Sequence, residues 1–285
     1  IYEGVDLPSP EIRYVDYAHW INNMEGQPDK QKQFWKKELA APLPFLDMPV
    51  VRDRADDNNY GSSTKVLTID GGDYQQIKKI ARNEKVSDFM FMLSAYYILL
   101  SKISGNTDII IGTDVIGRTQ PSLKNIVGTF VNILPLRLYV GNELHYKELL
   151  AQVKKCVIKA YENQDYQYDQ MKVLVNGVGM ESQNDIVKVH FSFANIVENN
   201  IESADFESFP LQSRKNEMSE YEFKLEVREM AGKLNISFIY HKFLYEDETI
   251  DLLMKYYSTI LSAISDETSI TIEDIDMIKP ACALA

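Results

Sequence analysis

Apolar residues recur along the chain with two spacings, one typical of helices and the other of strands. Spacings of three and four residues predict helices, and alternating or continuous short apolar runs predict strands. The predicted helices are residues 11–24, 29–40, 73–83, 89–103, 146–161 and 246–264. The predicted strands are residues 65–69, 107–113, 127–137, 186–196, 221–229, 233–241 and 271–278. Because helices and strands interleave, the pattern indicates an α/β protein.

Two segments predict a well-buried core. Residues 89–103 form a strongly apolar helix that begins after Ser87, a good N-cap residue. Residues 107–113 (TDIIIGT) are continuously apolar, which is typical of a strand covered on both faces. Residues 186–196 alternate instead, and this alternation places His190 on the polar side, facing solvent or an interface.

The strand predicted at residues 127–137 (VGTFVNILPLR) carries one amide in an apolar run. A buried amide without partners costs about 1–3 kcal/mol, so Asn132 must be paired. It is either a tie between backbone segments or a polar group at a reaction site. Arg137 either pairs with a carboxylate at the end of the strand or stabilises the floor of a site. Gly128 allows a close approach of the backbone.

Composition narrows the class of protein. The chain has 285 residues, of which 45% are hydrophobic, which is enough for one large domain or two small ones. Its net charge of -12 and the lack of a dense Lys/Arg run argue against nucleic-acid binding and docking on anionic membranes. The apolar run at residues 89–100 is too short to span a bilayer. Cys156 and Cys282 lie far apart, which favours a reducing compartment, the cytoplasm.

A search for catalytic motifs finds no self-contained active centre. The histidines are His19, His145, His190 and His241, and they form no His-Glu-x-x-His frame. The sequence also lacks a Cys-x-x-Cys pair, a Gly-x-Ser-x-Gly elbow and a Walker-type loop. We therefore expect neither a metal site nor a nucleotide site.

Four segments, in order, resemble motifs of the condensation domains of nonribosomal peptide synthetases. Residues 14–20 (YVDYAHW) are similar to Tyr-x-Asp-Tyr-Ala-x-Trp, and residues 34–39 (FWKKEL) to Tyr-Trp-x-x-x-Leu. Residues 127–137 resemble Gly-x-Phe-Val-Asn-Thr-x-x-x-Arg, and residues 163–169 (NQDYQYD) resemble His/Asn-Gln-Asp-x-Pro-Phe-Glu. Any one match is weak, but four in the same order are specific.

The resemblance implies a chloramphenicol acetyltransferase-like lobe, with a mixed sheet flanked by helices. Residues 1–63 correspond to lead-in helices and an inter-lobe linker, residues 64–278 to the C-terminal lobe, and residues 279–285 to a linker or tail. The family's His-His-x-x-x-Asp-Gly motif is absent from the chain, so no catalytic residue is expected here. Because residues 1–10 lack a methionine and read as a linker, we expect a piece of a longer protein, inert alone.

The resemblance also assigns roles to individual residues. Asn132, Arg137 and Gly128 correspond to the wall of the substrate tunnel between the lobes. The residues expected to have structural roles are Tyr14, Asp16, Tyr17 and Trp20 in the first helix and Gln164 and Asp165 at a helix end. Asp165 is unfavourable near a helix C-terminus, so it should have a compensating contact.

The family's activity is amide formation between an acyl or peptidyl donor and an aminoacyl acceptor. Both substrates arrive on the phosphopantetheine arms of carrier domains, so no cofactor is expected to bind the chain directly. The implied partners are the N-terminal lobe, upstream and downstream carrier domains and an adenylation domain.

Departures from the family's motifs leave other functions open. Gln167, Tyr168 and Asp169 replace the usual Pro, Phe and Glu, and Lys224 stands where Asp is common. Residues 181–186 have lost the family's Arg-Asp-x-Ser-Arg pattern. The alternatives are a non-catalytic docking module and an epimerising or heterocyclising relative.

Overall fold

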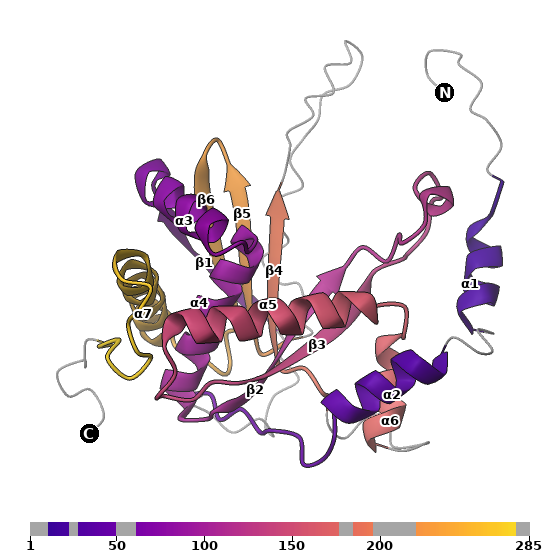
Figure 1. The fold of residues 1–285 in the computed structure, drawn as a ribbon, viewed down its shortest axis with the longest axis horizontal. Helices are drawn as coiled ribbons and strands as arrows, with labels where there is room; N and C mark the ends of the chain where they lie inside the picture. The colour runs from indigo at the N-terminus through magenta and orange to yellow at the C-terminus, as the bar shows by residue number, and fades with distance from the viewer. Residues whose placement is uncertain (1–10, 23–27, 50–60, 177–184, 196–220, 278–285) are drawn as a thin grey trace, which may run out of the picture. The chain divides into compact units, whose positions relative to one another are not determined.

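The computed structural model describes residues 11–22, 28–49, 61–176, 185–195 and 221–277 (Figure 1). The chain divides into two compact units. The first unit comprises Ile1–Leu43, Asp114–Leu134 and Lys159–Asp185. The second unit comprises Pro44–Thr113, Pro135–Ile158 and Ile186–Ala285. The boundary predicted at residue 63 therefore falls inside the second unit.

A six-stranded mixed sheet, most of which belongs to the second unit, has the order β1-β6-β5-β4-β2-β3. The strands are β1 (Ser62–Ile69), β2 (Asp108–Val115), β3 (Asn132–Tyr139), β4 (Val189–Asn195), β5 (Phe223–Met230) and β6 (Lys233–His241). β6 pairs antiparallel with β1 and β5, whereas β4 pairs parallel with β5 and β2. The mixed α/β architecture predicted from the sequence is confirmed.

Helices of the second unit flank this sheet (Figure 1). They are α3 (Gly71–Asn83), α4 (Asp88–Ser104), α7 (Asp247–Asp266) and most of α5 (Tyr146–Glu162). Every residue of α4 from Phe91 to Ser101 is buried, as its apolar sequence predicts. Ser87 Oγ accepts a hydrogen bond from the Met90 N–H, and Gly105, with φ of 71°, ends the helix. Local signals thus define both ends of the central helix.

The prediction that His190 faces solvent or an interface is wrong. His190 is fully buried and stacks on the ring of Tyr221, with centroids 4.5 Å apart. β4 is a central strand between β5 and β2, and its neighbour Phe191 is buried as well. Alternation of polar and apolar residues cannot reveal a strand that is covered on both faces, because the covering elements come from elsewhere in the chain.

The first unit contains α1 (Tyr14–Asn22), α2 (Pro28–Glu38), the short 3-10 helix η1 (Pro121–Leu123) and α6 (Tyr168–Asn176). Its buried cluster, which we call the first-unit core, consists of Tyr17, Leu123, Ile126 and Phe130, with Ile12 and Ile21 packed against it. The sequence pattern did not predict α6, because nine residues present too few turns for a clear apolar period.

Two predicted strands need correction. β3 begins only at Asn132, and the preceding Val127 and Val131 are 94% and 57% exposed. Phe130 enters the first-unit core instead of a sheet. Residues 271–277 form turns with a single bridge between His145 and Thr271, and residue 278 lies outside the described residues. Both segments are apolar enough for strands, but neither has a neighbouring strand along its whole length.

A polar contact joins α3 to β5 within the second unit. Lys78 Nζ lies 2.6 Å from Glu229 Oε1, and the buried Tyr74 hydroxyl donates to Glu229 Oε2 over 2.8 Å. The hydrogen bond from Lys78, partly opposed by burial, lowers the pKa of Glu229 from its usual 4.5. A lowered folded-state pKa stabilises the fold above pH 4.5, and this contribution is lost as the pH falls through the folded-state value.

We expect Glu229→Gln to reduce the free energy of unfolding at pH 7 by about 1 kcal/mol, and the difference from the parent chain to shrink below pH 4. Urea titrations across this pH range measure it. The control Glu143→Gln, at an exposed carboxylate, should leave the pH profile unchanged. A pH-independent difference for Glu229→Gln would contradict the expectation.

Candidate functional site

Asn132, the first residue of β3, is 5% exposed and lies in the first unit. Its Nδ2 donates hydrogen bonds to the backbone oxygens of Gln164, over 2.8 Å, and Tyr166, over 3.0 Å. Its Oδ1 accepts hydrogen bonds from the backbone N–H groups of Ile133 and Tyr168, each over 3.0 Å. Backbone groups therefore use the full hydrogen-bonding capacity of this amide.

The bond to Tyr168 satisfies the start of a helix. Tyr168 is the first residue of α6, and the first N–H groups of a helix have no partner within it. Asn132 supplies that partner from a position far along the chain, so its side chain ties β3 to the segment before α6. This geometry supports the interpretation of Asn132 as a tie between backbone segments. Its predicted role in a substrate tunnel stays a prediction, and a substrate would have to replace one of these bonds.

The segment before α6 is held from a second side by α2. Gln31 Oε1 accepts the Tyr166 N–H over 2.9 Å, and its Nε2 donates to Asp165 Oδ2 over 3.5 Å. Thr119 Oγ1 lies 3.5 Å from the other oxygen of Asp165, so the expected compensating contacts are present. Gln164 Nε2 donates to the Tyr161 backbone oxygen over 2.8 Å. Sequence reasoning missed Gln31 and Thr119, because neither lies in a recognisable motif.

Trp35 brings two of the motifs together. Its ring is 1% exposed, and its Nε1 donates to the backbone oxygen of Asn163 over 2.9 Å. Trp35 belongs to the segment 34–39 and Asn163 opens the segment 163–169, so these motifs are neighbours in the first unit. Since an indole N–H needs a partner when buried, this hydrogen bond explains the tryptophan at this position.

The residues of the first helix were predicted to fasten it across the lobe junction, and that role stays a prediction; within the first unit, Tyr14 and Tyr17 contact residues 129 and 130. The Tyr14 hydroxyl donates to the backbone oxygen of Thr129 over 2.8 Å, and the rings of Tyr14 and Tyr17 lie 5.3 and 4.5 Å from the Phe130 ring. The ring centroids of Trp20 and Tyr17 lie 6.0 Å apart, and Trp20 is 40% exposed.

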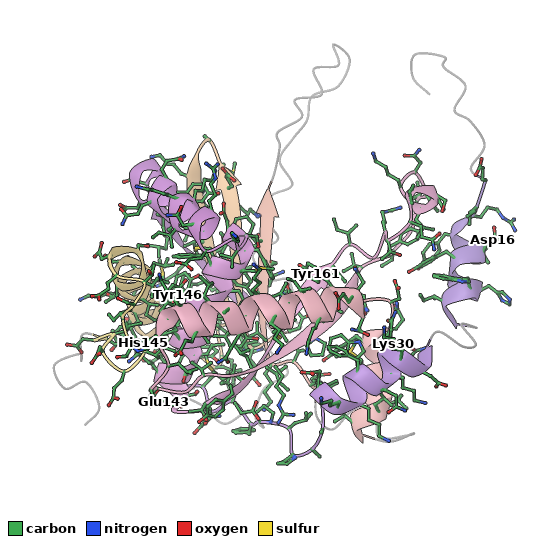
Figure 2. The ribbon with its side chains drawn as sticks, viewed as in Figure 1. Asp16, Lys30, Glu143, His145, Tyr146 and Tyr161 are labelled. Carbon is green, nitrogen blue, oxygen red and sulfur yellow. The ribbon has the colours of Figure 1, made fainter. Side chains whose placement is uncertain are left out.

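Asp16 stabilises the start of the same helix (Figure 2). Its carboxylate accepts the backbone N–H of Arg13 over 3.0 Å, the reciprocal bond of a capping box. Arg13 Nε also lies 3.3 Å from Asp16, and this side-chain hydrogen bond lowers the pKa of Asp16. The helix α1 is thus held by a local cap and by aromatic contacts with Phe130.

Gly128 lies directly under the ring of Tyr14. A Cβ atom at this position would lie 2.2 Å from Tyr14 Cδ2 and 2.6 Å from Tyr14 Cγ, far inside van der Waals contact. The close approach expected at this glycine is therefore present, and it serves packing. Its assignment to a tunnel wall stays a prediction.

We expect Gly128→Ala to lower the free energy of unfolding by about 1–3 kcal/mol, because the Tyr14 ring must move away from Phe130. The matched control is Gly72→Ala in α3, where a Cβ atom meets nothing within 4 Å. That change should be neutral or stabilising by up to about 1 kcal/mol. Urea unfolding of both variants measures the contrast, and equal effects would contradict the assignment.

Arg137 belongs to the second unit and pairs with a carboxylate. Its Nη2 lies 2.7 Å from Asp108 Oδ2, and its Nε lies 3.0 Å from Asp108 Oδ1. This two-point pairing links β3 to the first residue of β2. The Cys156 thiol, partly buried on α5, donates to the Arg137 backbone oxygen over 3.6 Å. Arg137 therefore pairs with a carboxylate, the first of the two roles considered for it. Its role in the floor of a site stays a prediction.

Three residues that depart from the family's motifs, at positions 167–169, have local partners in the first unit. Gln167 Nε2 donates to the Asp165 backbone oxygen over 3.0 Å. Asp169 pairs with Lys172 over 2.8 Å, and the Lys172 ammonium lies 5.3 Å from the centre of the Tyr168 ring. These side chains stabilise the first turn of α6. The substitutions relative to the family's motif are therefore compatible with the local structure.

The histidines do not converge on a site in the described residues. His145 Nδ1 is 2.8 Å from the Ser269 backbone oxygen beside the start of α5 (Figure 2), and His241 Nδ1 accepts the Phe243 N–H over 3.3 Å. His19 is exposed on α1, and His190 is buried in the sheet. Across the described ranges, no group of three His, Cys, Asp or Glu side chains could hold a metal ion.

Where the structure describes helices, no single one is long and apolar enough to cross a membrane. Only α3 and α4 taken together meet that criterion, and they are bent by 102° relative to each other.

The model of the family described as "Condensation domain" matches residues 1–283. The chain belongs to this condensation-domain family. Its relatives are nonribosomal peptide synthetases: surfactin synthase subunit 2 of Bacillus subtilis is 27% identical over 281 residues, and bacitracin synthase 2 of Bacillus licheniformis is 30% identical over 286 residues. These matches cover 99% and 98% of the chain but only 8% and 11% of the relatives, so the chain spans a small part of their length.

Solved structures confirm the condensation-domain fold. A four-domain nonribosomal peptide synthetase bound to AMP and glycine superposes with a TM-score of 0.83 at 20% identity, covering 97% of the chain and 22% of that protein. The X-domain from teicoplanin biosynthesis gives 0.82 at 18% identity, with coverages of 96% and 64%. The first condensation domain of the calcium-dependent antibiotic synthetase, in complex with a substrate analogue, gives 0.74 at 10% identity, with coverages of 97% and 60%.

Proposed function

We propose that the chain is the C-terminal lobe of a condensation domain that forms an amide bond inside a nonribosomal peptide synthetase. This proposal rests on the fact that the chain covers only part of each condensation-type domain that has been solved separately. The family match spans residues 1–283, yet the chain covers only 60–65% of the separately solved domains. The chain also lacks His-His-x-x-x-Asp-Gly, the motif of the other lobe.

In this reaction, the α-amine of the acceptor attacks the thioester carbon of the donor. The C–N bond forms, the C–S bond breaks, and the proton lost by the amine goes to the departing thiolate. An α-amine is partly neutral near pH 7, so positioning two tethered substrates can supply much of the rate. We propose that this lobe provides one wall of the tunnel in which they meet, and that the histidine comes from the other lobe.

The substrates would arrive on phosphopantetheine arms, so the partners are two carrier domains, the N-terminal lobe and an adenylation domain. A cytoplasmic location fits a reaction that uses reduced thiols. The sequence Phe-Val-Asn at residues 130–132 favours the condensing type over an epimerising or heterocyclising relative.

Reconstitution tests this function. Carrier proteins loaded with donor and acceptor are incubated with the 285-residue chain, with a histidine-bearing lobe of a relative, or with both, and the product is measured by mass spectrometry. We expect product only with both, at least tenfold above either part alone, and no product when the second histidine of the added motif is replaced by alanine. Product formed by the chain alone would contradict the proposal.

A non-catalytic docking module is the second candidate. The X-domain from teicoplanin biosynthesis shares the fold of this chain, with a TM-score of 0.82, and has been solved in a complex with OxyB. A module of this kind would retain a carrier or a tailoring enzyme without any amide formation. Pull-down against loaded and unloaded carrier proteins distinguishes the two: retention without turnover in the complete reconstitution supports docking.

A further inference from the structure

The segment between β2 and β3 carries apolar side chains that are open to solvent. Val127 and Ile116, at 94% and 73%, are the two most exposed large apolar side chains among the described residues, and Val131 is 57% exposed. We call these three residues the apolar patch, and all of them belong to the part of the first unit at residues 114–134. Single exposed apolar side chains are common on soluble proteins, but several on one segment mark an interaction surface.

Ile116 and Val131 lie next to each other in this segment. β2 and β3 are neighbours in the sheet, and the chain continues past the end of one and before the start of the other. A Cβ atom at Gly117 would lie 1.8 Å from the Phe130 backbone oxygen, so these continuations run side by side. Phe130 and Asn132 are each 5% exposed, and Val131 between them points to the opposite side, as in extended chain.

The inner side of the same segment is already packed. Leu123, Ile126 and Phe130 form the first-unit core together with Tyr17 of α1. The segment therefore has two apolar sides, of which one contacts α1 and the other is open. Exposed β-branched side chains on extended chain favour unwanted association, so natural proteins usually cover them.

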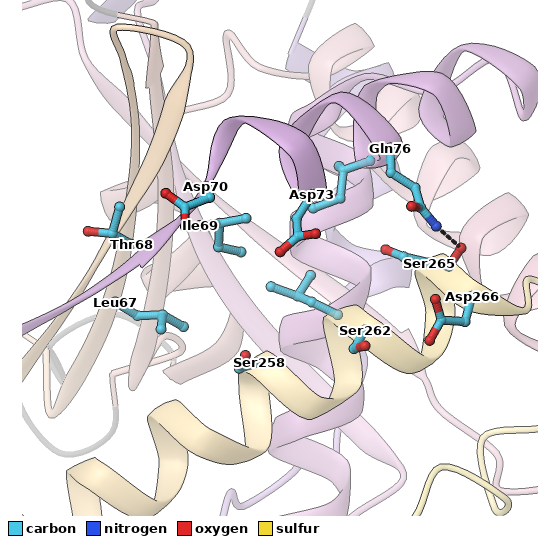
Figure 3. Close-up of a pocket in the computed structure, with 12 residues that line it drawn as sticks. Leu67, Thr68, Ile69, Asp70, Asp73, Gln76, Ser258, Ser262, Ser265 and Asp266 are labelled. Atoms are coloured by element: carbon cyan, nitrogen blue, oxygen red, sulfur yellow. Dashed lines mark hydrogen bonds between the residues drawn. The ribbon is translucent and has the colours of Figure 1, made fainter.

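The hollow between α3 and α7 of the second unit offers no comparable surface (Figure 3). Gln76 of α3 spans it with a hydrogen bond of 2.9 Å to the Ser265 backbone oxygen of α7. Ile77 and Leu261 are only 2% and 3% exposed, and most of the other lining side chains are aspartate, serine or threonine. Its accessible lining is therefore polar.

The proposed function supplies an occupant for the apolar patch. The chain covers only 60–65% of the separately solved condensation-type domains, so a whole domain of this kind has a further part. The proposal places Gly128 and Asn132 in the wall of a tunnel between the lobes, and Val127 and Val131 directly precede these residues. Charged side chains are depleted at the centre of protein interfaces, and the patch contains none.

We infer that the apolar patch belongs to the surface on which the N-terminal lobe docks, an inference that rests on the proposed function. Docking removes the side chains of Ile116 and Val131 from water. The hydrogen bonds of Asn132 to the segment before α6 hold the start of β3 directly beside this surface. Within the motif at residues 127–137, the outward-facing valines then contact the other lobe, whereas Asn132 supports them from behind.

Calorimetric titration of the chain with the histidine-bearing lobe of a relative tests this. Val131→Asp and Ile116→Asp should each weaken the affinity at least about tenfold, because docking would bury an unpaired carboxylate. Val131→Ile keeps an apolar side chain and should bind as the parent chain does. The matched control is Val173→Asp at an exposed valine of α6, which should leave the affinity unchanged. Urea unfolding verifies that each variant is folded.

Hydrogen exchange with and without the added lobe should show new protection at residues 114–131. No binding by the parent chain, or equal affinities for the parent and the two patch variants, would overturn the inference. Unchanged affinity with reduced product from Val131→Asp would place this side chain in the tunnel and would also overturn it. A dimer of the chain alone that Val131→Asp dissociates would overturn it in favour of a second copy.

The amide-forming reconstitution separates this inference from the proposed function. Product formed with the parent chain, together with equal affinities for the patch variants, would overturn the docking surface alone. Binding that depends on the patch, but without any product, would support the docking surface and contradict amide formation.

Discussion

Replacing Asn132 with alanine should lower the free energy of unfolding by about 2–4 kcal/mol. The change removes four hydrogen bonds and leaves the Tyr166 backbone oxygen and the first N–H of α6 without this partner in a buried place. Each buried polar group that loses its partner costs about 1–3 kcal/mol, partly recovered by rearrangement or water. Urea unfolding measures the total, and hydrogen exchange at residues 164–168 locates it.

The matched control is Asn163→Ala, which removes a single exposed hydrogen bond to the Lys159 backbone oxygen. It should cost less than about 1 kcal/mol. Asn132→Asp adds a test of the geometry, because the introduced carboxylate would face two carbonyl oxygens. Those contacts should raise its pKa in the folded state, so this variant should become more stable, relative to the parent, as the pH falls from 7 to 5. A loss below 1 kcal/mol for Asn132→Ala would contradict the structural role.

Gly117→Ala should have an effect of similar size, about 3 kcal/mol or more. Gly117 has φ of 67°, and a Cβ atom there would lie 1.8 Å from the backbone oxygen of Phe130. The clash involves backbone, which no change of rotamer relieves, so residues 117 and 130 must separate. Phe130 would then leave the first-unit core and the Arg118 guanidinium, which lies 4.1 Å from its ring centre.

Gly105→Ala separates the clash from the cost of the backbone conformation. Gly105 has a similar φ of 71°, but a Cβ atom there meets nothing within 4 Å. This control should cost only about 1 kcal/mol, the penalty for a left-handed alanine. Urea unfolding and hydrogen exchange at residues 114–134 measure the difference between the two variants. Equal losses would show that the contact with Phe130 is not tight.

The sequence predicted the elements whose signals are local. The central helix was expected at residues 89–103 and is found at Asp88–Ser104, because Ser87 and Gly105 mark its ends and its apolar run is long. α6 was missed, since its nine residues are too few for a clear period and its first N–H is capped by Asn132 from another segment. His190 was misplaced for a related reason: alternation within β4 says nothing about which elements cover its second face.

The candidate site shows the same limit. The sequence alone determined the α/β class, the resemblance of four motifs to condensation domains and the presence of an amide in an apolar run. Only the tertiary structure decided that all four motifs meet in the first unit, through hydrogen bonds from Tyr14 to Thr129, from Trp35 to Asn163 and from Asn132 to Gln164. It also decided that the side-chain amide of Asn132 makes all four of its hydrogen bonds with backbone groups. Periodicity and motifs record neighbours along the chain, whereas a hydrogen bond between residues 132 and 164 depends on the path of the chain in space.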